Sequence, residues 1–277
     1  MPSPNSERIT FSFTPRPGAL AKDVSMNLAV AAGTEPGLDT AVFMGLGNEG
    51  YAARRAAKHL VRAGLGEKSV AIVQSLPYWH AEPDEVGITH MAVTASEAVA
   101  EHLRDSHAVE DLHIVGESQA GPGALFAADE LPELYDGRVA LLRSLGLQGP
   151  ISPAKFVWRM ARSGLQLDQL LAPGTIPIVM RSNYRVAQDA LRGGDQLKFA
   201  LNFDATDPLK KVVARGKEVA VFTTDRDLVF PTEEVRYTIG KAGIRCVQRE
   251  ISGSHSSPAS KAGARQLIPV LDWLRTA

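Results

Sequence analysis

The most informative residues of this 277-residue chain are His113-Ile114-Val115-Gly116-Glu117-Ser118-Gln119-Ala120-Gly121. An apolar run leads into Ser118 and a helix-like run, Pro122–Leu131, follows it, so the serine stands at a turn between a strand and a helix. Large side chains two residues before or after such a serine would collide with backbone, and Gly116 and Ala120 are both small. The pattern is typical of a nucleophile elbow, although its usual form ends in glycine rather than alanine. The alternative is that Ser118 caps an ordinary helix.

Strand-like and helix-like segments alternate on both sides of this turn. Before it, we expect strands at Arg8–Thr14, Val24–Ala31, Thr40–Met44 and Lys68–Leu76 and helices at Glu49–Ala63 and Ile88–Leu103. From the turn onward, we expect strands at Leu112–Val115, within Arg138–Leu147, at Glu218–Thr223 and at Ile244–Ile251, and helices at Pro122–Leu131, Thr232–Gly240 and Ser256–Arg275, the last bent at Pro269. This order predicts an α/β fold with a mostly parallel central sheet, helices on both faces and an antiparallel edge formed by the first two strands.

Residues 151–215 interrupt the alternation. This segment is rich in helix-like pieces, prolines and glycines, and it carries ten basic residues against five acidic ones. We interpret it as a helical cap inserted between the sixth and seventh strands. The core domain would then consist of residues 1–150 and 216–277.

Composition excludes several classes of protein. Thirty Lys and Arg residues against 31 Asp and Glu give a net charge of −1, which does not suit dedicated nucleic-acid binding. No apolar run reaches the roughly 18 residues of a membrane span, and the start lacks the features of a signal peptide, so we expect a cytoplasmic protein. The single cysteine, Cys246, excludes an intrachain disulfide and a site of several thiolates; we expect it buried and inert within a strand.

The order of elements and the Gly116–Gly121 motif resemble the α/β-hydrolase fold superfamily over nearly the whole chain. The resemblance implies a catalytic serine, then an acid, then a histidine along the chain. The seven histidines are His59, His80, His90, His102, His107, His113 and His255. Only His255 follows Ser118, in a loop between the last strand and the last helix, so the implied base is His255. The alternative is a surface-loop histidine.

The implied acid follows the penultimate strand. Asp227 and Pro231 match the Asp-x-x-x-Pro arrangement that many α/β hydrolases have at this position. Such an acid would hold the correct tautomer of His255 and stabilise its protonated form. Asp225 is the alternative acid; otherwise it would be a turn aspartate that binds its own backbone.

The loop after the third strand implies the oxyanion site. Met44-Gly45-Leu46-Gly47 lies where many family members have His-Gly-x-Gly, which implies the Leu46 and Gln119 amides as donors. The same loop contains Gly45-x-Gly47-x-x-Gly50, a dinucleotide-binding pattern. That alternative requires a carboxylate at the end of the next strand, and Val73–Pro77 contains none. We therefore favour the oxyanion loop.

These residues predict a serine hydrolase that acts through an acyl-enzyme on a small carboxylic ester. The residues that we expect to line the substrate pocket are Tyr78, Trp79, Phe156, Trp158, Arg181 and Tyr184. Two alternatives stay open: a thioesterase or carbon–carbon hydrolase for an anionic substrate held by a cap arginine, and a non-catalytic binding protein. We expect a small-molecule partner and no metal or organic cofactor; self-association stays open.

Overall fold

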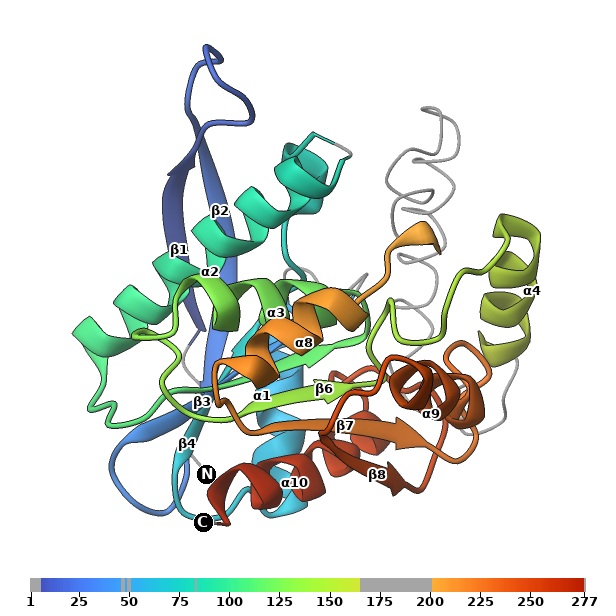
Figure 1. The fold of residues 1–277 in the computed structure, drawn as a ribbon. Coiled ribbons are helices and arrows are strands. Elements are labelled where there is room, and N and C mark those ends of the chain that lie inside the picture. Colours follow the sequence, from blue (N-terminus) through green and yellow to red (C-terminus); the bar gives the residue numbers. More distant parts are fainter. Residues whose placement is uncertain (1–5, 46–47, 49–50, 83, 165–200, 277) are drawn as a thin grey trace.

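The computed structural model describes residues 6–45, 48, 51–82, 84–164 and 201–276 (Figure 1). Within them, eight strands form one sheet in the order β1-β2-β4-β3-β5-β6-β7-β8. The strands are β1 (Ser6–Phe13), β2 (Lys22–Ala31), β3 (Leu38–Phe43), β4 (Ser69–Val73), β5 (His113–Glu117), β6 (Val139–Leu142), β7 (Val219–Thr224) and β8 (Val247–Ile251). The helices are α1 (Ala52–Ala63), α2 (Glu85–Ser106), α3 (Gly121–Glu130), α4 (Pro153–Gly164), α8 (Thr206–Ala214), α9 (Thr232–Lys241) and α10 (Lys261–Arg275), with short turns η1 (Tyr78–His80) and η2 (Ser118–Ala120).

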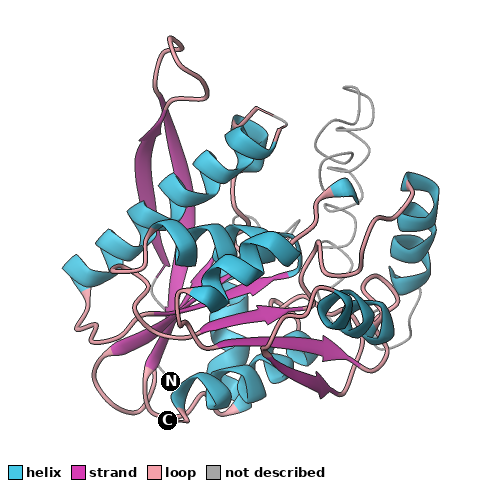
Figure 2. Ribbon diagram, in the orientation of Figure 1, coloured by secondary structure: helices cyan, strands magenta, loops and turns pink. Residues whose placement is uncertain are grey.

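The sheet is parallel except at one edge. Strands β3 to β8 pair in parallel, whereas β1 pairs antiparallel with β2 and β2 pairs antiparallel with β4. The prediction of a mostly parallel sheet with an antiparallel N-terminal edge is therefore confirmed. The β1–β2 hairpin extends beyond the helices that cover the sheet (Figure 2).

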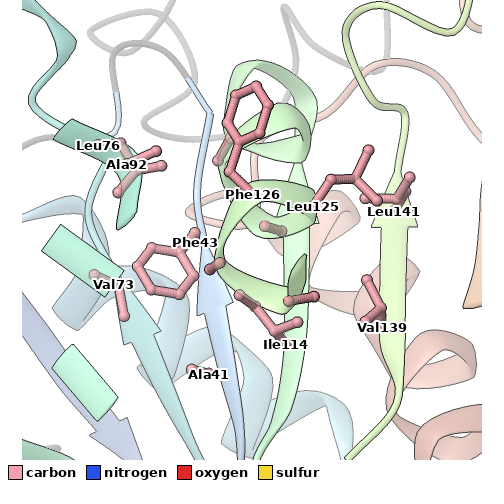
Figure 3. Packing of buried hydrophobic residues seen from close by; sticks show 14 of the residues in the cluster. Ala41, Phe43, Val73, Leu76, Ala92, Ile114, Leu125, Phe126, Val139 and Leu141 are labelled. Atoms are coloured by element: carbon pink, nitrogen blue, oxygen red, sulfur yellow. The ribbon is translucent and has the colours of Figure 1, made fainter. Parts of the chain in front are cut away.

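Alternate residues of the central strands enter two separate hydrophobic cores. In β6, Val139 and Leu141 pack into the core on the side of α2, α3 and α8, whereas Ala140 and Leu142 pack into the core on the side of α1 and α10. This follows from the two-residue period of a strand, which sends successive side chains to opposite faces. Figure 3 shows the first core, where Ile114 and Phe43 lie beneath Leu125 and Phe126 of α3. Both faces of the sheet are thus covered by helices, as predicted.

Several element boundaries differ from the sequence expectation. Helix α1 begins at Ala52 rather than Glu49, and α10 begins at Lys261, where the Ser260 side chain accepts a hydrogen bond from the Gly263 amide. Strand β4 ends at Val73, and β8 begins at Val247, so Cys246 lies just before the strand. Ser260 is a preferred N-cap residue, and such caps fix a helix start that apolar periodicity alone leaves uncertain.

The segment expected to form a cap, 151–215, is described only in part, and the cap stays a prediction. Helix α4 lies beside α9 near the β7–β8 edge, and Arg159 of α4 forms an ion pair with Glu234 of α9 (Figure 1). Helix α8 packs on α3, with Leu209 and Val212 in the core on that face. None of the helices that the structure describes combines the length and the apolar composition that a membrane span requires.

His113 opens β5, and its neutral form is favoured. Its Nδ1 accepts a hydrogen bond of 2.8 Å from the Arg138 amide, which requires that this nitrogen carry no proton. Burial lowers the pKa of His113 from its ordinary value, and the charges of Arg138 and Arg275 lower it further, against the opposing effects of Asp39 and Asp111. Protonation of His113 would therefore break a contact at the start of the central strand.

We predict that stability falls at acid pH partly through His113. Because its folded-state pKa lies below its unfolded value, the unfolded chain binds more protons, and the free energy of unfolding decreases as pH falls below about 6.5, by at most about 1.4 kcal/mol per pH unit from this residue. His113→Asn keeps an acceptor but cannot titrate, so it should show a shallower loss. Urea unfolding between about pH 5 and 8 measures both slopes. Equal slopes in the two proteins would contradict this assignment.

Candidate active site

The candidate site lies where parallel strands end. Gly45 follows β3, Ser118 follows β5, Asp227 follows β7 and His255 follows β8. The carboxyl ends of parallel strands lie at one edge of the sheet, and open α/β sheets bind their ligands there. Residues that are far apart in sequence are thus brought to one place by the sheet alone.

The backbone at Ser118 has the conformation expected of a nucleophile elbow. Its φ is 55°, in the left-handed region that non-glycine residues rarely adopt. The turn is closely packed. A Cβ at Gly116 would lie 2.7 Å from Ala124 Cβ, and one at Gly121 would lie 1.8 Å from Ser144 Oγ. Small residues are thus required on both sides of Ser118. On the C-terminal side of Ser118, the position that requires glycine is Gly121, one residue beyond Ala120.

The three predicted site residues form one chain of hydrogen bonds. His255 Nε2 lies 3.1 Å from Ser118 Oγ, and His255 Nδ1 lies 2.8 Å from Asp227 Oδ2. The Asp227 carboxylate is fully buried, whereas the His255 side chain is partly exposed. The ring of Phe230 packs edge-on against the imidazole, with centroids 5.2 Å apart. This geometry suits proton transfer from the serine hydroxyl to an imidazole held by a carboxylate.

The structure distinguishes between the two candidate acids. The second oxygen of Asp227, Oδ1, accepts hydrogen bonds from the Val229 and Phe230 amides at 2.8 and 2.9 Å, so its other oxygen is held toward His255. Asp225 Oδ1 instead accepts a 2.7 Å bond from the Gly253 amide. Asp227 therefore contacts the ring of His255. Asp225 instead binds the backbone at the start of the loop that carries His255.

The loop after β3 approaches the serine closely. A Cβ at Gly45 would lie 2.7 Å from Ser118 Cβ, so only glycine fits there without a shift. The Gly45 amide donates a 2.6 Å hydrogen bond to Glu117 Oε2, so its hydrogen is already bonded within the protein. Leu46, one of the two predicted oxyanion donors, lies outside the described residues. Gln119, the other, is in η2, at the N-terminal end of α3, where amides lack acceptors within the helix.

Asn48 joins this loop to the histidine loop. It is buried, its Nδ2 donates a 3.0 Å bond to the Gly45 carbonyl and its Oδ1 accepts a 2.5 Å bond from Ser257 Oγ. The Gly45 carbonyl also accepts a hydrogen bond from Ser75 Oγ. The two loops that flank Ser118 are thus connected through side chains as well as through the sheet.

Two charged residues lie behind the site, and no motif in the sequence predicts them. Glu117, immediately before the serine, forms a buried ion pair with Arg143, with Nη2 and Oε1 3.1 Å apart. Burial lowers the pKa of the Arg143 guanidinium, and the carboxylates of Glu117 and Asp227 oppose this effect. One signal could have revealed the pair: a glutamate at the end of an apolar strand is almost never buried without a partner. Nothing in the sequence identifies Arg143 as that partner.

The predicted pocket residues are not all placed. Tyr78 is buried in the hydrophobic core, and burial raises the pKa of its hydroxyl above its usual range. Trp79 belongs to the same short turn, η1. Phe156 is half-buried against the core, and Trp158 is 58% exposed, with the Arg162 guanidinium over its ring. Arg181 and Tyr184 lie outside the described residues. A pocket lined by these six residues stays a prediction.

Cys246 and the alternative cofactor site can also be placed. Cys246 is half-buried rather than fully buried, and desolvation raises the pKa of its thiol to about 11, which suits an unreactive cysteine.

The dinucleotide-binding alternative has no support in the described residues of the loop after β3. Gly45 packs on the serine turn, and β4 is followed by Gln74 and Ser75 rather than by the carboxylate that a ribose requires. Among the described residues, no group of three or more His, Cys, Asp or Glu side chains could hold a metal ion.

Comparisons with known proteins concern the fold. No family model matches the chain, and no curated protein matches it in sequence. The peroxisomal α/β-hydrolase Lpx1 from Saccharomyces cerevisiae is similar with a TM-score of 0.65, 14% identity and coverage of 100% of this chain and 91% of that one. Carboxyl esterase 2 from Tuber melanosporum is similar with a TM-score of 0.58 and 14% identity, over 100% of this chain and 89% of that one. A thermophilic esterase from Thermogutta terrifontis is similar with a TM-score of 0.56 and 17% identity, over 97% of this chain and 97% of that one. The chain has the α/β-hydrolase fold, which hosts many activities.

Proposed function

We propose that this chain is a serine hydrolase that cleaves a small carboxylic ester through an acyl-enzyme. One observation carries the proposal: a serine with a left-handed backbone is hydrogen-bonded to a histidine, which is hydrogen-bonded to a buried aspartate. A helix-cap serine would need neither partner. The solved structures with a similar fold include esterases, which agrees with this chemistry without deciding it.

The mechanism uses the three residues in sequence. Ser118 Oγ attacks the ester carbonyl while His255 Nε2 takes its proton, and the alcohol leaves with that proton. Water, activated by the same nitrogen, then attacks the acyl group, and Ser118 is released with its proton restored. Asp227 keeps the Nδ1 proton of His255 directed toward itself, so that Nε2 is the free base. The Gln119 amide, together with that of Leu46, would hold the developing oxyanion; each such donor is worth about 100- to 1,000-fold in rate.

The nature of the bond cleaved is the open part of this proposal. Thioesters and carbon–carbon bonds adjacent to a carbonyl can use the same three residues. These alternatives assume an anionic substrate held by a cap arginine such as Arg181, which the described part of the chain does not include. A small carboxylic ester requires no such arginine, so we propose the ester.

The first test is covalent labelling of Ser118. A fluorophosphonate should add once to the wild-type protein, and the adduct should disappear in Ser118→Ala and be strongly slowed in His255→Ala, as intact-mass analysis would show. The same protein should hydrolyse p-nitrophenyl acetate and butyrate, with kcat/KM falling at least about 1,000-fold in Ser118→Ala. No adduct on folded wild-type protein would contradict the proposal. Labelling without ester turnover would instead favour the thioester, carbon–carbon or binding alternatives.

A second prediction separates the two aspartates. In Asp227→Asn the side-chain amide would face His255 Nδ1 and favour the wrong tautomer, so kcat should fall by about 1,000- to 10,000-fold. Asp225→Asn is the matched control. It alters only a loop contact and should cost about tenfold or less. Esterase assays on both variants measure the difference, and a larger loss in Asp225→Asn would reverse the assignment of the acid.

A further inference from the structure

A buried ion pair lies directly beneath the proposed catalytic residues. The side chains of Arg143 and Glu117 are 0% and 2% exposed. Removing two charges from water costs about as much as their attraction returns, so a buried pair is weak grounds for stability. The presence of this pair at the end of β5, immediately before the serine, suggests a role in geometry.

Arg143 connects the serine turn to the histidine loop. Its Nη2 donates to Glu117 Oε1 at 3.1 Å, and its Nη1 donates to the Ser254 carbonyl at 3.2 Å and to Gln266 Oε1 at 2.7 Å. The Gln266 amide nitrogen returns to the same Ser254 carbonyl at 3.1 Å. Ser254 immediately precedes His255, so both Arg143 and Gln266 hold the peptide that carries the base.

Glu117 extends the connection to the third loop. While Oε1 accepts from Arg143, Oε2 accepts the 2.6 Å bond from the Gly45 amide. The Glu117 carboxylate uses one oxygen to bind Arg143 and the other to bind the loop after β3. The serine turn, the loop after β3 and the histidine loop are thus parts of one buried hydrogen-bonded unit.

The backbone conformation of Arg143 also supports a role in the geometry of the site. Its φ is 51°, and within the described residues Arg143 and Ser118 are the two non-glycine positions with positive φ. Residues held in such rare conformations cluster at functional sites, where the surrounding structure enforces them. Both of these residues belong to the unit just described.

The charges of this unit also suit the reaction. Glu117 and Asp227 are two buried carboxylates, and Arg143 is close enough to both that each opposes the lowering of its pKa by burial. With a neutral imidazole, the group of four carries one negative charge. When His255 takes the serine proton, its positive charge lies beside the Asp227 carboxylate and the group becomes neutral, an arrangement that suits acyl transfer.

We propose that Glu117, Arg143 and Gln266 are positioning residues, which hold the Gly45 loop, Ser118 and His255 in register for acyl transfer. The inference rests on the proposed serine hydrolase function. None of the three residues is assigned to touch the substrate. Their removal should therefore lower kcat while leaving KM little changed, since misplacement by about 1 Å can cost on the order of 100-fold in rate.

The test is a double-mutant cycle that consists of Glu117→Gln, Arg143→Met and the double variant. Urea unfolding, kcat, KM and the rate of phosphonylation by a fluorophosphonate are measured on each protein. Each single variant leaves a buried group without its partner and should unfold at lower urea. The double variant removes both charges and should regain much of the lost stability. We expect its kcat and phosphonylation rate to stay at least about tenfold below wild type, with KM within about threefold.

The result that would overturn the proposal is recovery of kcat together with stability in the double variant, because the pair would then act only on folding. Arg143→Lys covers the case in which Arg143→Met does not fold. Lysine keeps the charge opposite Glu117 but cannot form the fork that reaches both Ser254 and Gln266. The proposal expects kcat about tenfold lower in Arg143→Lys; an unchanged kcat would contradict it.

Asp39 and Arg275 provide a matched control. This ion pair is also largely buried and bidentate, with Arg275 Nε 2.7 Å from Asp39 Oδ2 and Arg275 Nη2 3.1 Å from Asp39 Oδ1. It joins the start of β3 to the end of α10, at the opposite end of the parallel strands from the candidate site. The cycle of Asp39→Asn and Arg275→Met should lower stability and leave kcat within about twofold. Equal losses of kcat in both cycles would assign the effect to general destabilisation and overturn the proposal.

A spectroscopic readout separates this inference from the proposed function. The Nδ1 proton of His255, bonded to Asp227, should give a far-downfield proton resonance in wild type. If wild type neither turns over esters nor reacts with the fluorophosphonate, the proposed function fails. A shift or loss of the resonance in the double variant would still support positioning of His255, and an unchanged resonance would contradict it.

Discussion

The candidate site depends on one steric constraint, the left-handed backbone at Ser118. A non-glycine residue in this conformation costs roughly 1–2 kcal/mol, so the surroundings have to enforce it. They do so through close packing. At Gly45, Gly116 and Gly121 even the methyl group of an alanine would lie within 1.8 to 2.7 Å of a neighbouring atom, so a side chain there would collide with the turn or its surroundings. This packing fixes Ser118, which is half-buried, at the turn between β5 and α3.

The parallel sheet supplies the rest of the geometry. Its strands carry apolar residues on both faces, so two helical layers cover it and only the strand ends are available for polar chemistry. Asp227 and His255 follow the ends of two different strands, and His255 contacts both Asp227 and Ser118. Behind them, Glu117 at the end of β5 and Arg143, directly after β6, form a buried ion pair.

The sequence was informative where the constraint is local. A strand followed by a serine between small residues predicts the turn, and chain order then singles out His255. Contacts between distant residues were not predictable in the same way. The choice between Asp225 and Asp227 depends on which carboxylate the amides of Val229 and Phe230 orient, and the partner of Glu117 lies 26 positions along the chain. Helix starts also depended on caps such as Ser260 rather than on apolar periodicity.

The most direct test of this account is a crystal structure of the fluorophosphonate-treated protein. We predict phosphorus bonded to Ser118 Oγ, one phosphonyl oxygen within hydrogen-bond distance of the Gln119 amide, and His255 still bonded to Asp227. The Gly45 amide should remain on Glu117. Phosphorus on another residue, or a phosphonyl oxygen bound by the Gly45 amide in place of Glu117, would contradict the arrangement described for the serine turn.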